Sequence, residues 1–236
     1  MSVLSWMSIF LYGIVQLNFS CADEARGMAW RERRPTMRRK TEDRRLGFVR
    51  AAGKLFIERG FGAVSMEAVA AEAGASKVTL YGYFPSKEAL FEAFVNLAGE
   101  GGLEEMEAAK AGGDLRETLR QLGTAYLDLV TRPDVVEANR LIMGEAGRQP
   151  QLSRIFYENG PRKTLIVICE TIGSLMERDL LRRADARQTG LYFKSLCEAG
   201  LVERQLWGLD GVPHEQTRQV AVEDAINVFL AAFGTR

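Results

Sequence analysis

Apolar residues recur every three or four positions along most of this chain, which is the spacing that places them on one face of an α-helix. The alternation of apolar and polar residues that is typical of β-strands is almost absent. The pattern therefore predicts an all-α fold. The expected helices cover residues 41–59, 66–73, 77–84, 86–98, 114–131, 134–147, 154–181, 185–207 and 215–233, and the seventh has an irregularity near Gly160-Pro161.

Two of these helices are short and lie close together, from residue 65 to residue 84. Ser65 and Ser76 each precede one of them, where a serine oxygen can cap the first turn. Gly74 lies between the two, where a tight turn needs a backbone conformation that costs little mainly for glycine. Leu80 is placed to pack the second helix onto the first. This spacing predicts a helix-turn-helix, a unit whose second helix enters the major groove of DNA.

The second of these helices would present polar side chains on the face opposite its buried one. Lys77, Tyr81 and Lys87 are predicted to contact phosphates, and Thr79 and Tyr83 to contact base edges. The alternative is a generic helical hairpin with a polar face, because short motifs also occur by chance. The complete set of predicted DNA-binding residues is Ser65, Ser76, Lys77, Val78, Thr79, Tyr81, Tyr83 and Lys87.

The residues on both sides of this motif add further features to the predicted helix-turn-helix. Residues 44–95 read RRLGFVRAAGKLFIERGFGAVSMEAVAAEAGASKVTLYGYFPSKEALFEAFV, with AAGKLFIERGF as a first helix, AGASK as the turn and TLYGYF as the recognition helix. This segment resembles the N-terminal domain of the tetracycline-repressor (TetR) family, from which Gly82 inside the recognition helix is a mild departure. The resemblance implies a homodimer, an N-terminal three-helix helix-turn-helix domain, a C-terminal helical domain for ligand binding and dimerisation, and transcriptional repression.

The C-terminal half carries a second resemblance. EANRLIMGEAGRQPQLSRIFYENGPRKT and VEDAINVFLAAFG look like the ligand domain of the AcrR/AefR-like branch, which suggests an efflux or stress-response repressor. The expected division is an apolar segment with a basic arm at 1–36, a DNA-binding domain at 37–95, and a ligand-binding and dimerisation domain at 96–236.

Apolar stripes on the last two helices predict the dimer interface. The alternative is that these stripes close the core of the protomer itself. The residues concerned are Leu191, Leu196, Leu201, Val222, Ile226, Phe229 and Phe233.

A small apolar or amphipathic inducer is expected among apolar and aromatic side chains of the central helices, although such side chains lie more often in a core than in a pocket. The candidates are Tyr126, Leu127, Met143, Phe156, Leu165, Cys169 and Trp207.

Charge is balanced over the whole chain, with 31 Lys and Arg against 31 Asp and Glu, but it is not evenly distributed. Residues 28–88 contain 13 basic and 7 acidic side chains, so the rest of the chain is acidic. A basic module on an acidic body is typical of a protein that meets phosphates with one part. The arm RERRPTMRRK is predicted to contact phosphates or the minor groove, and a solvated charge run is the alternative.

Candidate chemistry is sparse. The three cysteines, Cys21, Cys169 and Cys197, form no CxxC pair, and His214 is the only histidine. No nucleophile, acid–base or metal-binding constellation is apparent, so we expect no catalytic residues, no metal and no cofactor.

The first 27 residues include the apolar run VLSWMSIFLYGIVQLNF. The run is short for a membrane span, which needs about 20 apolar residues, and it lacks the basic start and cleavage site of a signal peptide. We favour a mistaken upstream start, with translation from Met28 or Met37. A membrane tether or an extra helix are the alternatives. No stable membrane association is expected, and the predicted location is cytoplasmic.

The preferred interpretation is a homodimeric, ligand-responsive transcriptional regulator that binds a palindromic double-stranded DNA operator. A DNA binder without a ligand is one alternative. The other is an all-α enzyme or interaction protein with an incidental helix-turn-helix.

Overall fold

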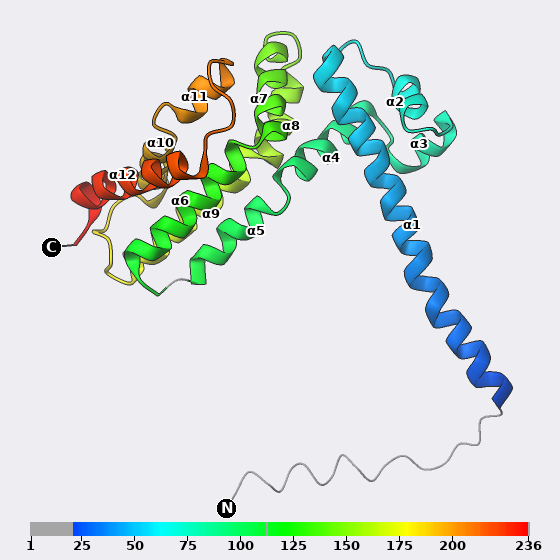
Figure 1. Cartoon of the computed structure of the whole chain (residues 1–236), viewed down its shortest axis with the longest axis horizontal. Helices are drawn as coiled ribbons and strands as arrows, with labels where there is room; N and C mark the ends of the chain where they lie inside the picture. Colours follow the sequence, from blue (N-terminus) through cyan, green and yellow to red (C-terminus); the bar gives the residue numbers. More distant parts are fainter. Residues whose placement is uncertain (1–20, 112, 236) are drawn as a thin grey trace, which may run out of the picture. The chain divides into compact units, whose positions relative to one another are not determined.

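The computed structural model describes residues 21–111 and 113–235, with side chains for 40–110 and 113–235. These residues form helices and no strand, apart from one isolated bridge between Leu181 and Gly234, which confirms the all-α prediction. The elements are α1 (Cys21–Arg59), α2 (Met66–Glu72), α3 (Lys77–Tyr83), α4 (Lys87–Gly99), α5 (Gly102–Ala108), the 3-10 turn η2 (Ala109–Ala111), α6 (Leu115–Val130), α7 (Pro133–Glu145), α8 (Pro150–Asn159), α9 (Pro161–Glu177), α10 (Ala186–Glu198), α11 (Leu201–Leu206) and α12 (Glu215–Phe233) (Figure 1).

The chain divides after Arg45 into two compact units, each of which is taken by itself. The described part of the first unit is helical. Most of the apolar segment predicted at the start of the chain falls in residues 1–20, outside the described residues. No helix of the described ranges combines the length and the apolar character needed to cross a membrane.

Several helix boundaries differ from the predictions, and α5 lies where no helix is expected. α1 is helical from the first described residue, Cys21, although its expected start is residue 41, because arginine, alanine and glutamate favour a helix without needing an apolar face. The single helix expected over 185–207 is two helices, α10 and α11. Gly200 separates them with a φ of 86°, a left-handed conformation that a continuous α-helix does not contain. The irregularity predicted near Gly160 is confirmed as the junction of α8 and α9.

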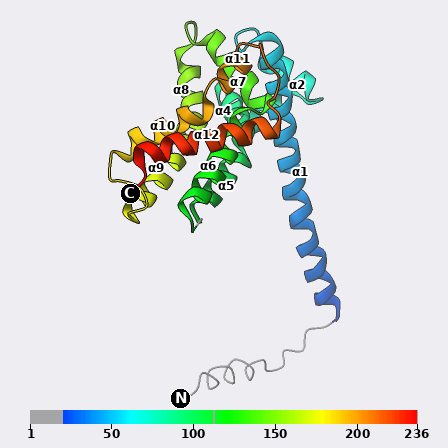
Figure 2. The same ribbon diagram turned by 60° about the vertical axis from the view of Figure 1, so that its left-hand side comes forward.

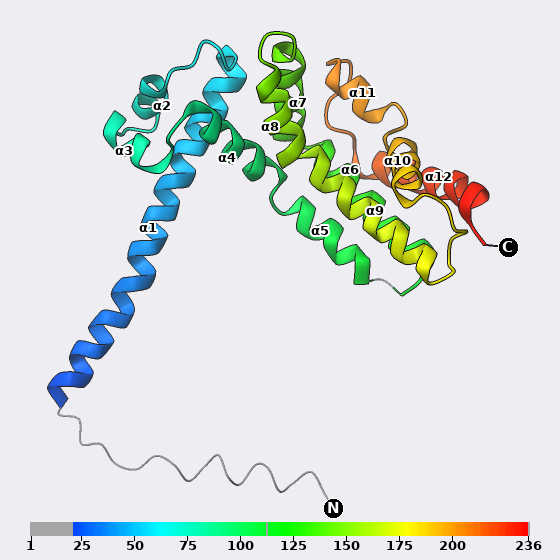
Figure 3. The same ribbon diagram turned by 180° about the vertical axis from the view of Figure 1, so that it is seen from behind.

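The helix-turn-helix is built on an aromatic core. The rings of Phe56, Phe61 and Phe91 lie 5.1–6.0 Å apart between centroids and join α1, the following loop and α4. The same continuous core includes apolar side chains of α7 and α8, among them Ile142 and Phe156. Figures 1 and 3, which are opposite views, show α7 and α8 beside α4. The DNA-binding module therefore shares its core with helices that come some 50 residues later in the chain.

A polar network reinforces this junction. The ammonium of Lys163, at the start of α9, donates to Asn96 Oδ1 on α4 at 2.6 Å. The amide of Asn96 in turn donates to Asn159 Oδ1 at the end of α8, at 3.3 Å. The junction of α8 and α9 is thereby bonded directly to α4.

A second core fills the C-terminal body, where α5, α6, α9, α10 and α12 pack together (Figure 2). Val222, Ile226 and Phe229 are buried in this core, and the ring of Phe229 meets that of Phe193 edge-on at 5.1 Å. This corrects the prediction that the stripe on the last helix forms the dimer interface. The face of α12 that carries Val222, Ile226 and Phe229 meets the protomer's own core.

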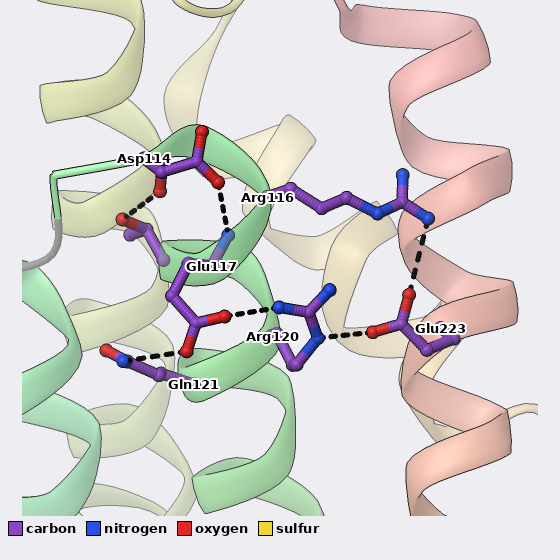
Figure 4. Close-up of polar contacts among 7 residues, drawn as sticks. Asp114, Arg116, Glu117, Arg120, Gln121 and Glu223 are labelled. Atoms are coloured by element: carbon purple, nitrogen blue, oxygen red, sulfur yellow. Dashed lines mark hydrogen bonds and ion pairs between the residues drawn. The ribbon is translucent and has the colours of Figure 1, made fainter.

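Ion pairs beside the buried face of α12 also join this helix to α6. Figure 4 shows Arg120 between Glu117 of its own helix and Glu223 of α12, whose Oε1 accepts from Arg120 Nε at 2.5 Å. Arg116 reaches the other oxygen of Glu223 at 3.3 Å. The two guanidinium groups, Arg120 first, hold the pKa of Glu223 below its ordinary value, so this carboxylate is ionised at neutral pH.

Candidate nucleic-acid interface

Local hydrogen bonds position the two helices of the motif, as predicted. The Oγ of Ser65 accepts from the amide of Ala68 at 3.2 Å at the start of α2. The Oγ of Ser76 accepts from the amide of Thr79 at 3.1 Å at the start of α3. Gly74, with a φ of 60°, makes the turn between them. Both serines therefore serve first as helix caps, and their contact with DNA stays a prediction.

The exposed face of α3 is formed mainly by Val78 and Tyr81, whose side chains are 83% and 43% exposed. The ammonium of Lys77 lies over the ring of Tyr81, 5.7 Å from its centroid, and forms an ion pair with Glu67 of α2. The hydrogen bond to Glu67 raises the pKa of Lys77 above its ordinary value. Lys77 is thus charged but already partnered within the protein.

The two predicted base-contacting residues lie in different surroundings. Thr79 is exposed, and its hydroxyl is 2.8 Å from the hydroxyl of Ser76. Tyr83 is half-buried, and its ring packs against Phe48 at 5.4 Å between centroids. Tyr83 therefore lies at the edge of the core and away from the face that Val78 and Tyr81 share.

Lys87 has a structural role that the sequence did not indicate. Its ammonium donates to the carbonyls of Phe61 and Val64, both at 2.8 Å, and lies 4.3 Å from the centroid of the Phe61 ring. Burial lowers the pKa of this lysine. The first residue of α4 thereby closes the loop between α1 and α2. The position of this lysine directly after a helix-capping serine does not indicate these hydrogen bonds, because the loop that it binds lies more than 20 residues earlier.

Positive charge in this region is concentrated before Leu46. Residues 46–95 contain five basic and five acidic side chains, whereas residues 28–45 contain eight basic and three acidic ones. Two of the five later cations, Lys54 and Lys77, are paired with Glu72 and Glu67. Most of the positive charge of this region therefore lies in residues 28–45, and its contact with phosphates stays a prediction.

The seven predicted pocket residues are not brought together. Tyr126 and Leu127 are buried in the C-terminal core, whereas Phe156 belongs to the core of the DNA-binding module. Met143 and Trp207 are 62% and 66% exposed. Leu165 and Cys169 are half-buried on α9. The prediction of these seven residues rests on residue type and helical spacing, and neither property specifies which helices face each other.

A groove of about 450 Å³ lies along α5 and α6, and none of the seven lines it. Its lining combines alanines with charged and polar side chains: Glu105, Ala108, Ala109, Glu117, Arg120, Gln121, Thr124, Ala125 and Asp128. The only sign of this groove in the sequence is a face of small residues on the short helix α5, followed by a polar face on α6.

In the described part of the chain, no three His, Cys, Asp or Glu side chains gather in a way that could hold a metal ion. Burial raises the pKa of Cys197 to about 12 and raises that of Cys169, so both thiols are protonated at neutral pH.

Each half of the chain matches a known protein family. Residues 48–94 match the family described as bacterial regulatory proteins, tetR family. Residues 117–235 match the family described as AefR-like transcriptional repressor, C-terminal domain.

Similar proteins include a helix-turn-helix-type transcriptional regulator of Mycobacterium tuberculosis, 32% identical over 118 residues, which are 48% of this chain and 54% of that protein. The chain thus spans about half the length of the curated relatives it matches. Among solved structures, the flavonoid-responsive regulator FrrA is 33% identical, with a TM-score of 0.69 over 83% of this chain and 99% of that one. A regulator from Mesorhizobium loti shares the fold, with a TM-score of 0.72, 24% identity, and coverage of 82% and 98%.

Proposed function

Because this chain belongs to the tetR family of bacterial regulatory proteins, we propose that it is a transcriptional repressor that binds a palindromic operator as a homodimer. The observation that carries the proposal is the α2–α3 unit, in which both helices are capped and α3 presents Val78 and Tyr81 to solvent. A repressor of this kind acts in the cytoplasm, where the DNA lies.

The dimer is proposed to form through the outer faces of α10 and α12. Tyr192 on α10 and Val220 and Val228 on α12 are exposed apolar side chains on the two helices. Two helices from each of two protomers would make a four-helix interface around a two-fold axis. That axis would match the symmetry of a palindromic operator.

The proposal is tested by selecting duplexes from a random DNA library with the full chain. The enriched sequences should contain an inverted repeat, and affinity should fall with salt, since lysine and arginine displace counterions from phosphates.

Tyr81→Ala is expected to weaken binding to the enriched duplex at least tenfold, because it removes an aromatic side chain from the proposed interface. The matched control is Tyr157→Ala on α8, whose side chain is also 43% exposed and which should bind like the unaltered protein. Failure to enrich any sequence would favour the alternatives, an all-α enzyme or an interaction protein.

Ligand response is the second part of the proposal. The name of FrrA describes a response to flavonoids, and the groove of this chain is lined by alanines together with polar and charged side chains. We propose that a small amphipathic molecule binds there and weakens operator binding by favouring a different arrangement of the two recognition helices.

A panel of flavonoids is the first probe for this site. We expect at least one to raise the melting temperature and release the enriched duplex, and Thr124→Trp, which fills the groove, to abolish both effects. Gln151→Trp, at an exposed position of α8, is the control. Equal responses of the two variants would place the ligand outside the groove.

A further inference from the structure

Val78 is the most exposed large apolar side chain of the described residues. It occupies the second position of α3, directly after Lys77. A valine that is 83% exposed contributes almost nothing to the core, since hydrophobic stabilisation scales with the apolar area removed from water. Its apolar surface is therefore available for a contact outside the protomer.

Gly82 lies four residues after Val78, so the two share one face of α3. A Cβ at Gly82 would meet no atom within 4 Å, and its φ is not in the left-handed region. The fold therefore does not require glycine there, although glycine inside a helix is less favourable than alanine. A missing side chain does let another molecule approach the helix closely.

The polar neighbours on α3 are engaged within the protein. The hydroxyl of Thr79 is bonded to Ser76, and the ammonium of Lys77 is paired with Glu67. The surface at Val78 and Gly82 themselves is therefore apolar, and it is low at Gly82, with the larger side chain of Tyr81 beside it. Such a face suits the thymine 5-methyl group, which is the one apolar group that a standard base pair displays in the major groove.

We propose that Val78 contacts a thymine 5-methyl group in each operator half-site, and that Gly82 lets α3 come close enough for this contact. The inference rests on the proposed function and specifies a base that the recognition helix reads.

The test uses the enriched duplex with single thymines replaced by deoxyuridine, which lacks only the methyl group. One thymine in each half-site should show a loss of about fourfold on replacement, the size expected for burying one methyl group. In Val78→Ala that loss should disappear at this position, while replacements elsewhere have the same effect in both proteins.

Gly82→Ala gives a second, independent readout. We expect a higher melting temperature, because alanine favours the helix and its Cβ meets nothing, together with at least tenfold weaker operator binding. Gly144→Ala on α7, where a Cβ also meets nothing, is the control and should leave binding unchanged.

The outcomes separate the two claims. Enrichment of no duplex would overturn the proposed function and this inference with it. Enrichment followed by a methyl effect that persists in Val78→Ala, or by no methyl effect at all, would overturn the contact alone. Unaltered binding by Gly82→Ala would overturn the role of Gly82.

Discussion

Phe229→Glu is expected to unfold the C-terminal core. The Phe229 side chain is fully buried, and its ring meets those of Phe193 and Phe233, each at 5.1 Å. An unpaired charge in such a place is destabilising by several kcal/mol, which is comparable with the whole stability of a typical domain. Circular dichroism during urea titration should show loss of the cooperative transition.

The neighbouring substitution Val228→Glu is expected to behave differently. Val228 lies on the exposed side of α12, so its replacement should preserve helical content and the melting transition. If α12 contributes to the dimer as proposed, sedimentation should shift from dimer to monomer. Operator affinity should then fall, because two linked half-site contacts gain effective concentration that a single one lacks.

These two substitutions, at neighbouring positions of α12, distinguish a residue of the core from a residue of the dimer interface. A Phe229→Glu protein that folds and sediments as a monomer would place the interface on the stripe that the sequence suggested. A Val228→Glu protein that remains dimeric would move the interface away from this part of α12.

Lys87→Met is expected to destabilise the helix-turn-helix module by about 2 kcal/mol, since charge-assisted hydrogen bonds contribute more than neutral ones. The change removes the donor from the carbonyls of Phe61 and Val64 but retains the apolar stem. Thermal and urea unfolding measure the effect. Lys77→Met is the control, because its partner Glu67 is exposed and surface ion pairs contribute little.

The salt dependence of operator binding tests whether Lys87 contacts a phosphate in addition to stabilising the loop. If the ammonium acts on the loop, Lys87→Met lowers affinity while the slope of log affinity against log salt is unchanged. If it also contacts a phosphate, as its position after the recognition helix predicts, the slope falls by about one for each site. The slope separates the two roles even in a destabilised protein.

Local signals predicted the helix-turn-helix well. The caps by Ser65 and Ser76 and the turn at Gly74 each involve residues within a few positions of one another, and all three appear as expected. The end of a helix and the conformation of a turn depend mainly on such neighbours.

Long-range partners could not be predicted in the same way. The spacing of Val222, Ile226 and Phe229 identifies an apolar face, but the same spacing serves a core and an interface equally well. The carbonyls that Lys87 binds belong to a loop whose path depends on the packing of α1 against α4. The groove beside α6 likewise depends on which helices are neighbours, a property that no single helix encodes.

The core that the DNA-binding module shares with α7 and α8 has a consequence for synthesis of the chain. Ile142, Leu152 and Phe156 complete the apolar surroundings of α4, and a ribosome produces them well after the recognition helix. The module therefore has an incomplete core until residue 156 has left the exit tunnel, although domains generally fold as units in order of synthesis. A nascent chain that ended before α8 would carry a correctly capped recognition helix on a module whose apolar core is incomplete.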